Sequence, residues 1–145
     1  MISKNTRETK QIAETFLAKL LKNQKKNQGT LVVGLSGDLG IGKTAFIKSV
    51  AKYLGIKDKI SSPTYVIMKK YLIKKKECKF FFHLDAYRLE SEEELLHLGW
   101  KEIVSNKENL VFIEWPENIL KIMPSDSKYI HITTNAKGHR DFKFK

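Results

Sequence analysis

A glycine-rich turn between an apolar run and an amphipathic segment limits the possible folds of this chain more than any other part of it. Residues 37–44 read Gly-Asp-Leu-Gly-Ile-Gly-Lys-Thr and match the pattern G-x-x-x-x-G-K-[ST]. The run TLVVGLS at 30–36 predicts a buried strand before the turn, and helically spaced apolar residues follow it, with Gly55 placed to end the helix. Strand, turn and helix in this order predict a P-loop, a structure that holds phosphate groups.

Each part of the turn has an expected role in binding a nucleoside triphosphate with magnesium. The glycines let successive backbone amides face the phosphates, and the helix N-terminus adds its positive dipole. Lys43 is expected to reach the β- and γ-phosphates, and the Thr44 hydroxyl to bind magnesium. The predicted nucleotide-binding residues of the turn are Gly37, Asp38, Leu39, Gly40, Ile41, Gly42, Lys43, Thr44 and Ala45.

Two carboxylates follow apolar strand-like runs and are candidates for completing the magnesium site. The run FFFHL leads into Asp85, and the run LVFI leads into Glu114. In open α/β sheets ligands bind at the edge where such strands end. Either acid fits the role, and Asp85 is preferred as the metal residue.

The residues after the strand that leads into Asp85 indicate whether the bound nucleotide carries guanine or adenine. A GTPase of the Ras type has Asp-x-x-Gly there, whereas Asp85 is followed by Ala86, Tyr87 and Arg88. The segment 106–109, Asn-Lys-Glu-Asn, lacks the aspartate of the guanine-reading Asn-Lys-x-Asp and precedes a strand instead of following one. We therefore expect ATP.

The remaining pattern predicts alternating helices and strands in a single domain over residues 1–145. Asn5 and Glu8 resemble a capping box that starts a helix at 6–22, and a second helix is expected at 90–98. The predicted strands, the first two as a hairpin, are 65–73, 79–84, 110–114, 129–133 and 141–144. The fold class is α/β: a single-domain P-loop NTPase with a central mixed β-sheet flanked by helices.

Charge and composition narrow the setting. The net charge of +11 fits either a polyanionic partner or a solvated basic surface, and only Arg7, Arg88 and Arg140 of the 27 basic residues are arginines. No signal peptide or membrane-spanning run is visible, so we expect a cytoplasmic protein that does not bind membranes. The single cysteine, Cys78, is expected to be an ordinary thiol.

Three further motifs, taken with the P-loop, resemble the TsaE (YjeE) family. They are Ser-Pro-Thr-Tyr at 62–65, His-Leu-Asp-Ala-Tyr-Arg at 83–88 and Ile-Glu-Trp-Pro-Glu at 113–117, in that family's order and spacing. The resemblance implies a small ATPase of tRNA threonylcarbamoyladenosine biosynthesis, slow alone and stimulated by its TsaB and TsaD partners. TsaD would transfer the threonylcarbamoyl group to an adenosine beside the anticodon.

The resemblance also implies roles for individual residues. Thr44 would bind magnesium, Asp85 and Glu114 would complete the metal and water shell, and Thr64 would act as a switch residue near the γ-phosphate. The implied catalytic residues are Lys43, Asp85, Glu114 and Thr64, and Thr9 would lie near the nucleotide. Ala45 departs from the second threonine often found after the Lys-Thr pair.

Some alternatives remain open from the sequence. His83 is expected to be a packed core histidine, and Trp115 a packing or partner-contact residue. Arg88 is either a surface ion-pair residue or a residue that contacts phosphate or a partner. A small-molecule kinase would carry the same P-loop, and an RNA-binding module with a vestigial P-loop would share the basic charge. Whether tRNA is contacted directly or only through the partners is open.

Overall fold

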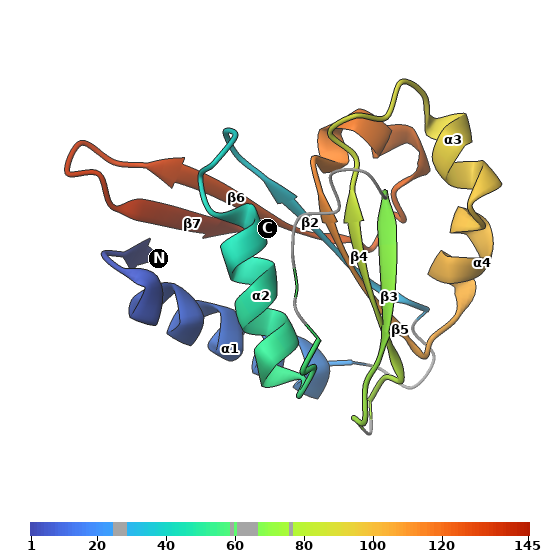
Figure 1. Ribbon diagram of the computed structural model, residues 1–145, viewed down its shortest axis with the longest axis horizontal. Helices are drawn as coiled ribbons and strands as arrows, with labels where there is room; N and C mark the ends of the chain where they lie inside the picture. Colours follow the sequence, from blue (N-terminus) through green and yellow to red (C-terminus); the bar gives the residue numbers. More distant parts are fainter. Residues whose placement is uncertain (25–28, 59, 61–66, 76) are drawn as a thin grey trace.

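The structure is a computed structural model that describes residues 1–24, 29–58, 60, 67–75 and 77–145. Its strands form one seven-stranded sheet in the order β1-β7-β6-β2-β5-β4-β3, with helices on both faces (Figure 1). This arrangement confirms the predicted α/β fold with a central mixed sheet. The elements in chain order are β1 (Ile2–Ser3), α1 (Thr6–Lys22), β2 (Leu31–Ser36), α2 (Lys43–Tyr53), β3 (Met68–Leu72), β4 (Phe80–Asp85), α3 (Glu92–His97), α4 (Trp100–Ser105), β5 (Asn109–Glu114), the 3-10 helix η1 (Pro116–Ile122), β6 (Lys128–Thr134) and β7 (Arg140–Phe144).

The middle of the sheet is parallel and its edges are antiparallel. Strand β2 pairs in parallel with β5 and β6, and β4 pairs in parallel with β5. The predicted hairpin of β3 and β4 is confirmed, and β7 pairs antiparallel with both β6 and β1. In this register Glu114 lies beside Leu35 of β2 and Asp85 of β4. The carboxyl ends of β2, β4 and β5 therefore meet at one edge of the sheet.

The first helix begins and ends as its sequence predicts. The Asn5 side chain accepts a hydrogen bond of 2.9 Å from the Glu8 amide, which satisfies a backbone donor at the start of α1. The Glu8 carboxylate accepts 2.6 Å from the amide of Lys4, one residue before the amide that a capping box would use. The second helix, α2, begins at Lys43, directly after Gly42 at the end of the glycine-rich turn.

Two apolar cores lie on the two faces of the sheet because neighbouring strand residues point in opposite directions. Helices α1 and α2 cover one face, and α3 and α4 lie on the other side of the sheet (Figure 1). On β4, Phe81 belongs to the core under α1 and α2, whereas Phe82 belongs to the core around Trp100. The site described below lies at the carboxyl ends of β4 and β5 and at the start of α2.

The structure differs from the sequence-based prediction mainly around the second core. The helix predicted at 90–98 is the shorter α3, and Gly99, at φ 87°, separates it from α4. The sequence pattern did not indicate α4, η1 or the two-residue strand β1, because each is too short to show a clear period. The start of the strand predicted at 65–73 lies outside the described residues.

Among the described residues, no helix is long and apolar enough to cross a lipid bilayer.

Candidate functional site

The glycine-rich turn leaves β2 and enters α2 through a backbone path that only glycine accommodates. Gly37, Gly40 and Gly42 have φ values of 144°, 75° and 114°. A Cβ atom at Gly37 would also lie 2.6 Å from the carbonyl oxygen of Ile132. The turn is therefore fixed both by left-handed backbone angles and by close packing against β6.

Lys43 at the start of α2 is held by the turn that precedes it. Its side chain donates hydrogen bonds of 2.6 Å to the Gly37 carbonyl and 2.9 Å to the Asp38 carbonyl. Its ammonium lies 4.3 Å from the centroid of the Trp115 ring, a cation–π contact. Lys43 is 4% exposed, and burial lowers its pKa below the usual value, against the opposing pull of Glu114, Glu117, Asp85 and Asp38.

Glu114 links the start of α2 to the interior of the sheet. The Thr44 hydroxyl lies 3.1 Å and 3.3 Å from its two carboxylate oxygens and donates to them. On the other side, the Nε2 atom of His83 lies 2.8 Å from Glu114 Oε2. Glu114 is 3% exposed and His83 is fully buried. The hydroxyl, the carboxylate and the imidazole thus form a row from the turn into the core.

Asp85 lies beside Glu114, at the end of the neighbouring strand. The two residues are paired across β4 and β5, and one Asp85 carboxylate oxygen accepts a 3.0 Å hydrogen bond from the Tyr87 amide. Asp85 is half-buried, while Glu114 is buried in direct contact with Thr44. Both carboxylates predicted from the ends of apolar runs therefore lie at one place, and their roles stay a prediction.

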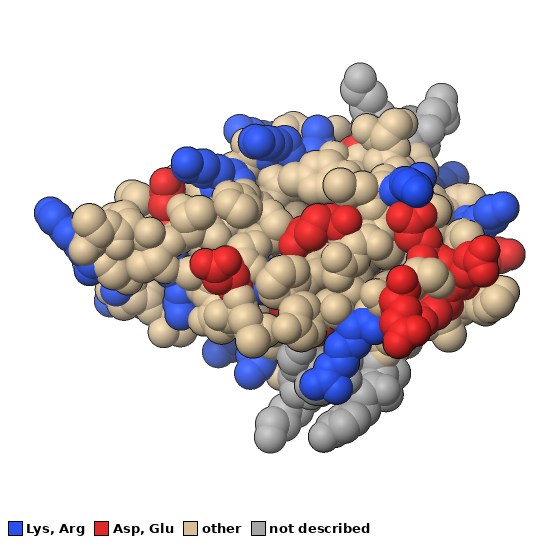
Figure 2. Space-filling view, turned by 90° about the horizontal axis from the view of Figure 1, so that it is seen from above, with Lys and Arg blue, Asp and Glu red and all other residues tan. Residues whose placement is uncertain are grey.

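These groups surround a cavity of about 540 Å³. Its lining combines the turn with the ends of β4 and β5: Leu39, Gly40, Gly42, Lys43, Thr44, Ala45, Ile67, Asp85, Tyr87, Arg88, Glu114, Trp115 and Arg140. Figure 2 looks onto this end of the molecule and shows acidic side chains gathered on one side, where α3 contributes Glu92, Glu93 and Glu94. Cationic and carboxylate side chains therefore line the same cavity, and an acidic patch lies at the same end of this basic protein.

Trp115 forms one wall of the cavity through an unusual backbone conformation. At φ 61° it is the one non-glycine residue with positive φ in the described part of the chain. Its amide donates 3.1 Å to the Leu35 carbonyl, and its ring lies 4.9 Å from that of Tyr87. A bulky residue in this region is strained, and such strain is concentrated at functional sites. The contact with Lys43 extends the packing role predicted for Trp115.

Arg140 lines the cavity although the sequence pattern gave it no role. It lies at the start of β7, and its guanidinium would be 3.0 Å from a Cβ atom added at Gly42. The only available signal was the scarcity of arginine, since the pairing of β6 and β7 places Arg140 here. Arg88 also lines the cavity, and its role stays a prediction.

The other predicted residues take different positions. The carbonyls of Gly37 and Asp38 hold Lys43, and Ile41 packs against the core under α1 and α2. Thr9 is buried, with its hydroxyl 2.7 Å from that of Ser3, and does not line the cavity, so its place near a nucleotide stays a prediction. Thr64, with the rest of its Ser-Pro-Thr-Tyr motif, lies outside the described residues.

Comparison with known proteins finds a matching family model, similar sequences and a similar solved structure. A family model described as "Threonylcarbamoyl adenosine biosynthesis protein TsaE" matches residues 3–142. The TsaE protein of Rickettsia bellii is 40% identical over 119 residues, 81% of this chain and 74% of that protein. The TsaE protein of Treponema pallidum is 34% identical over 114 residues, 79% of this chain and 80% of that protein.

Two further matches extend this result. The TsaE protein of Borreliella burgdorferi is 44% identical over 93 residues, 63% of this chain and 64% of that protein. The crystal structure of Bacillus subtilis YdiB superimposes with a TM-score of 0.75 at 28% identity, covering 99% of this chain and 82% of YdiB. With its P-loop turn and with a family model that spans nearly its whole length, the chain belongs to the TsaE family of tRNA threonylcarbamoyladenosine biosynthesis.

Proposed function

We propose that this chain binds ATP with Mg²⁺ in the cavity at the end of β2, β4 and β5 and hydrolyses it in support of threonylcarbamoyl transfer to tRNA. One observation carries the proposal: Lys43 and Thr44 face Glu114 around a cavity that the glycine-rich turn also lines. A nucleotide needs cationic and amide donors for its phosphates, and a magnesium ion needs oxygen ligands. The cavity brings both kinds of group to one place.

The phosphate-binding part of the proposal rests on backbone and cations. The turn and the N-terminus of α2, which begins at Lys43, supply backbone amides and a positive dipole. Lys43, Arg88 and Arg140 add positive charge around the cavity. Arginine pairs with phosphate oxygens through two parallel hydrogen bonds, so the two arginines suit the outer phosphates or a group that develops charge during hydrolysis.

The donor set fits Mg²⁺, which prefers hydroxyl and carboxylate oxygens and commonly shares its shell with phosphates. The Thr44 hydroxyl donates a hydrogen bond to Glu114, which leaves the lone pairs of the hydroxyl oxygen free for a cation. No cluster of three or more His, Cys, Asp and Glu that could hold a metal alone occurs among the described residues. Thr44, Glu114 and Asp85 would therefore hold the ion together with the phosphates, and the ion would supply neutralisation of charge there.

The chain's own residues have separate tasks in hydrolysis. Lys43 must exchange the Gly37 and Asp38 carbonyls for phosphate oxygens, and must also move relative to the Trp115 ring. One of the two neighbouring carboxylates, Glu114 or Asp85, would orient the attacking water and accept its proton. The internal contacts of Lys43 hold it in its resting position, and this supports low activity alone and stimulation by partners that favour the rearranged state.

Membership of the TsaE family supports a proposal for the biological setting. TsaB and TsaD are the proposed partners, and TsaD would carry out the transfer to the adenosine beside the anticodon. We expect this to occur in the cytoplasm, with tRNA engaged through the partner complex. Direct contact between this chain and tRNA is a separate matter, on which the charge of +11 is compatible with either answer.

The test is a comparison of nucleotide binding and phosphate release by the purified chain, alone and with TsaB, TsaD and tRNA. We expect ATP binding, slow release of phosphate alone and faster release in the mixture. Lys43→Ala, Thr44→Ala, Asp85→Asn and Glu114→Gln should each lower the stimulated rate. No ATP binding even with the partners present would reject the proposal, and phosphate transfer to a metabolite would favour a kinase.

A further inference from the structure

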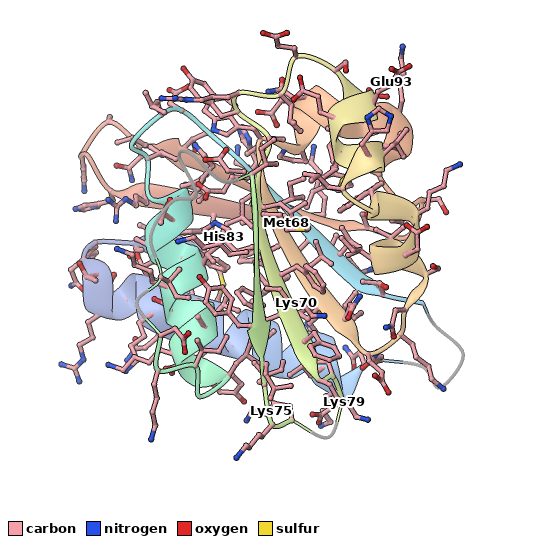
Figure 3. The ribbon with its side chains drawn as sticks, turned by 45° about the vertical axis from the view of Figure 1, so that its right-hand side comes forward. Met68, Lys70, Lys75, Lys79, His83 and Glu93 are labelled. Atoms are coloured by element: carbon pink, nitrogen blue, oxygen red, sulfur yellow. The ribbon has the colours of Figure 1, made fainter. Side chains whose placement is uncertain are left out.

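His83 departs from the apolar character of its surroundings. It lies on the side of β4 that faces α2 (Figure 3), two residues after Phe81 and paired across the strands with Phe112. A phenylalanine or leucine at this position would extend the core without burying a polar ring. Burial of a polar group is unfavourable unless hydrogen bonds replace those made with water. Core packing alone therefore gives no reason for an imidazole here.

The hydrogen bonds of His83 point to one partner. The Nε2 atom lies 2.8 Å from Glu114 Oε2, and the Nε2–H tautomer of the ring donates a hydrogen bond to the carboxylate there. The Nδ1 atom is buried and has no hydrogen-bonding partner in the described part of the chain. The ring thus satisfies Glu114 while one of its own atoms remains unsatisfied, so the histidine serves the carboxylate more than it serves itself.

The position of Glu114 makes this contact consequential. Its carboxylate can rotate about the last side-chain bond, and rotation changes which oxygen faces Thr44 and the cavity. A hydrogen bond to Oε2 from behind limits that rotation. We propose that His83 is a positioning residue that fixes the orientation of the Glu114 carboxylate toward Thr44 and the cavity. This inference rests on the proposed function and adds a residue that acts only through Glu114.

Two substitutions at position 83 separate positioning from packing. His83→Phe keeps an aromatic ring among Phe81 and Phe112 but removes the donor, whereas His83→Gln keeps an amide donor close to the position of Nε2. The matched control is His97→Phe on the exposed end of α3. The measurements are kcat and KM for ATP with the partner proteins, ATP affinity by calorimetry with Mg²⁺ or with EDTA, and thermal unfolding.

We expect His83→Phe to lower kcat by about 10 to 100-fold, as is typical when the partner of a metal-binding side chain is lost. Affinity for ATP in EDTA should stay within about twofold of the unmodified chain, because the phosphate-binding amides are unchanged. His83→Gln should recover most of the rate. In a Glu114→Gln background, His83→Phe should no longer change the gain in affinity that Mg²⁺ provides, because the two residues act as one unit.

Several results would overturn the inference: an unchanged kcat in His83→Phe, an equal loss of affinity with and without Mg²⁺, or an undiminished effect in the Glu114→Gln background. If His83→Phe does not fold, His83→Gln and His83→Asn decide, since the shorter asparagine does not reach Glu114. Equal rates in those two variants would also overturn it. Failure of the proposed function looks different, because the unmodified chain would then bind no ATP.

Discussion

The two ends of the parallel strands both bury polar side chains, but they use them in opposite ways. At the carboxyl ends, Lys43 and Glu114 are buried in the wall of the cavity, and buried His83 is hydrogen-bonded to Glu114 from behind. At the amino ends, Thr30 and Asn109 are buried and bonded to the backbone of the α4 region. Thr30 donates 2.8 Å to the Ile103 carbonyl and 2.6 Å to that of Asn106.

The comparison shows how the buried polar residues at the carboxyl ends differ from those at the amino ends. Each end contains one buried side-chain atom without a hydrogen-bonding partner in the described residues, His83 Nδ1 and Asn109 Oδ1. An unsatisfied atom is therefore not diagnostic. The difference lies in the partner of each side chain. Asn109 donates to the backbone carbonyl of Ile103 in α4, whereas His83 donates to the Glu114 carboxylate, which can rotate. The carboxyl end should control activity and the amino end stability.

The largest effect is expected from removing the charge at the carboxyl end. Lys43→Ala should lower partner-stimulated kcat by about 10²–10³, the usual loss when a donor to developing charge is removed. Its melting temperature should change far less than its activity, because relief of the desolvation cost of the buried ammonium offsets the lost hydrogen bonds to Gly37 and Asp38. Phosphate-release assays and thermal unfolding measure the two effects, with Lys52→Ala on the exposed side of α2 as the control. If the loss of activity were explained by unfolding of the variant at the assay temperature, the carboxyl end would not differ from the amino end in the way proposed.

The amino ends of the strands should be inaccessible to reagents, and the reactivity of the Cys78 thiol measures this. Cys78 lies just before β4 and is 2% exposed, and burial, with a smaller effect from Glu77, raises its pKa from 9.0 to about 11. At pH 8 the reactive thiolate is then about a hundredfold scarcer than in the unfolded chain. A thiol reagent should therefore label native protein about a hundredfold more slowly than denatured protein. Rapid labelling of the native chain would mean that this end opens.

The same thiol gives a pH dependence of stability with a defined sign. Between pH 9 and 11 the unfolded chain loses the Cys78 proton while the folded chain keeps it. The stabilising contribution is therefore complete below pH 9 and is lost as pH rises toward 11. The unfolding free energy, measured in urea, should fall more steeply with pH over that window for the unmodified chain than for Cys78→Ala. Parallel pH profiles would contradict the shift.

A moderate loss of stability without loss of chemistry is expected from Thr30. Thr30→Val keeps the shape of the side chain but removes the donor to the carbonyls of Ile103 and Asn106. Both carbonyls keep a hydrogen bond from Asn109, so the expected loss is that of the Thr30 hydrogen bonds alone, about 0.5–1.5 kcal/mol of unfolding free energy. Urea unfolding measures this, and Thr134→Val at an exposed position of β6 is the control. Nucleotide hydrolysis below the unfolding transition should match that of the unmodified chain, and a lowered rate would link the two ends.

A pair of glycines tests the comparison within the turn itself. Gly37 and Gly40 both have positive φ, but only Gly37 lacks room for a side chain, since a Cβ there would lie 2.6 Å from the Ile132 carbonyl oxygen. Gly40→Ala should cost ~1–2 kcal/mol of backbone strain. Gly37→Ala should in addition displace the turn and weaken ATP binding by about tenfold relative to Gly40→Ala, measured by calorimetry. Equal affinities would show that contact with β6 does not set the turn.

The sequence predicted the parts of the site that depend on local pattern. The turn, Lys43 and Thr44 were recognisable because phosphate binding needs those residue types at fixed spacing. Asp85 and Glu114 could be placed because apolar runs lead into them, and their pairing across β4 and β5 confirms that they lie together. Helix α1 was predicted to its ends because Asn5 marks its start.

The parts that depend on tertiary arrangement could not be predicted. Arg140 reaches the turn only because β7 pairs with β6 on the far side of β2, and no local pattern fixes that strand order. The sequence indicated that His83 would be buried, but its contact with Glu114 depends on the parallel register of two strands. Trp115 gave no sign of its left-handed backbone, since tertiary contacts impose that conformation.

The packing of Arg140 over the turn also constrains which sequences this fold can accept. Gly42 has a backbone angle that disfavours a side chain, and the guanidinium fills the space that such a side chain would occupy. Positions 42 and 140, nearly a hundred residues apart, are therefore not free to vary independently. Relatives that place another residue at 42 should have a smaller side chain at 140, and transplanting the turn alone into another protein would leave out a part of its wall.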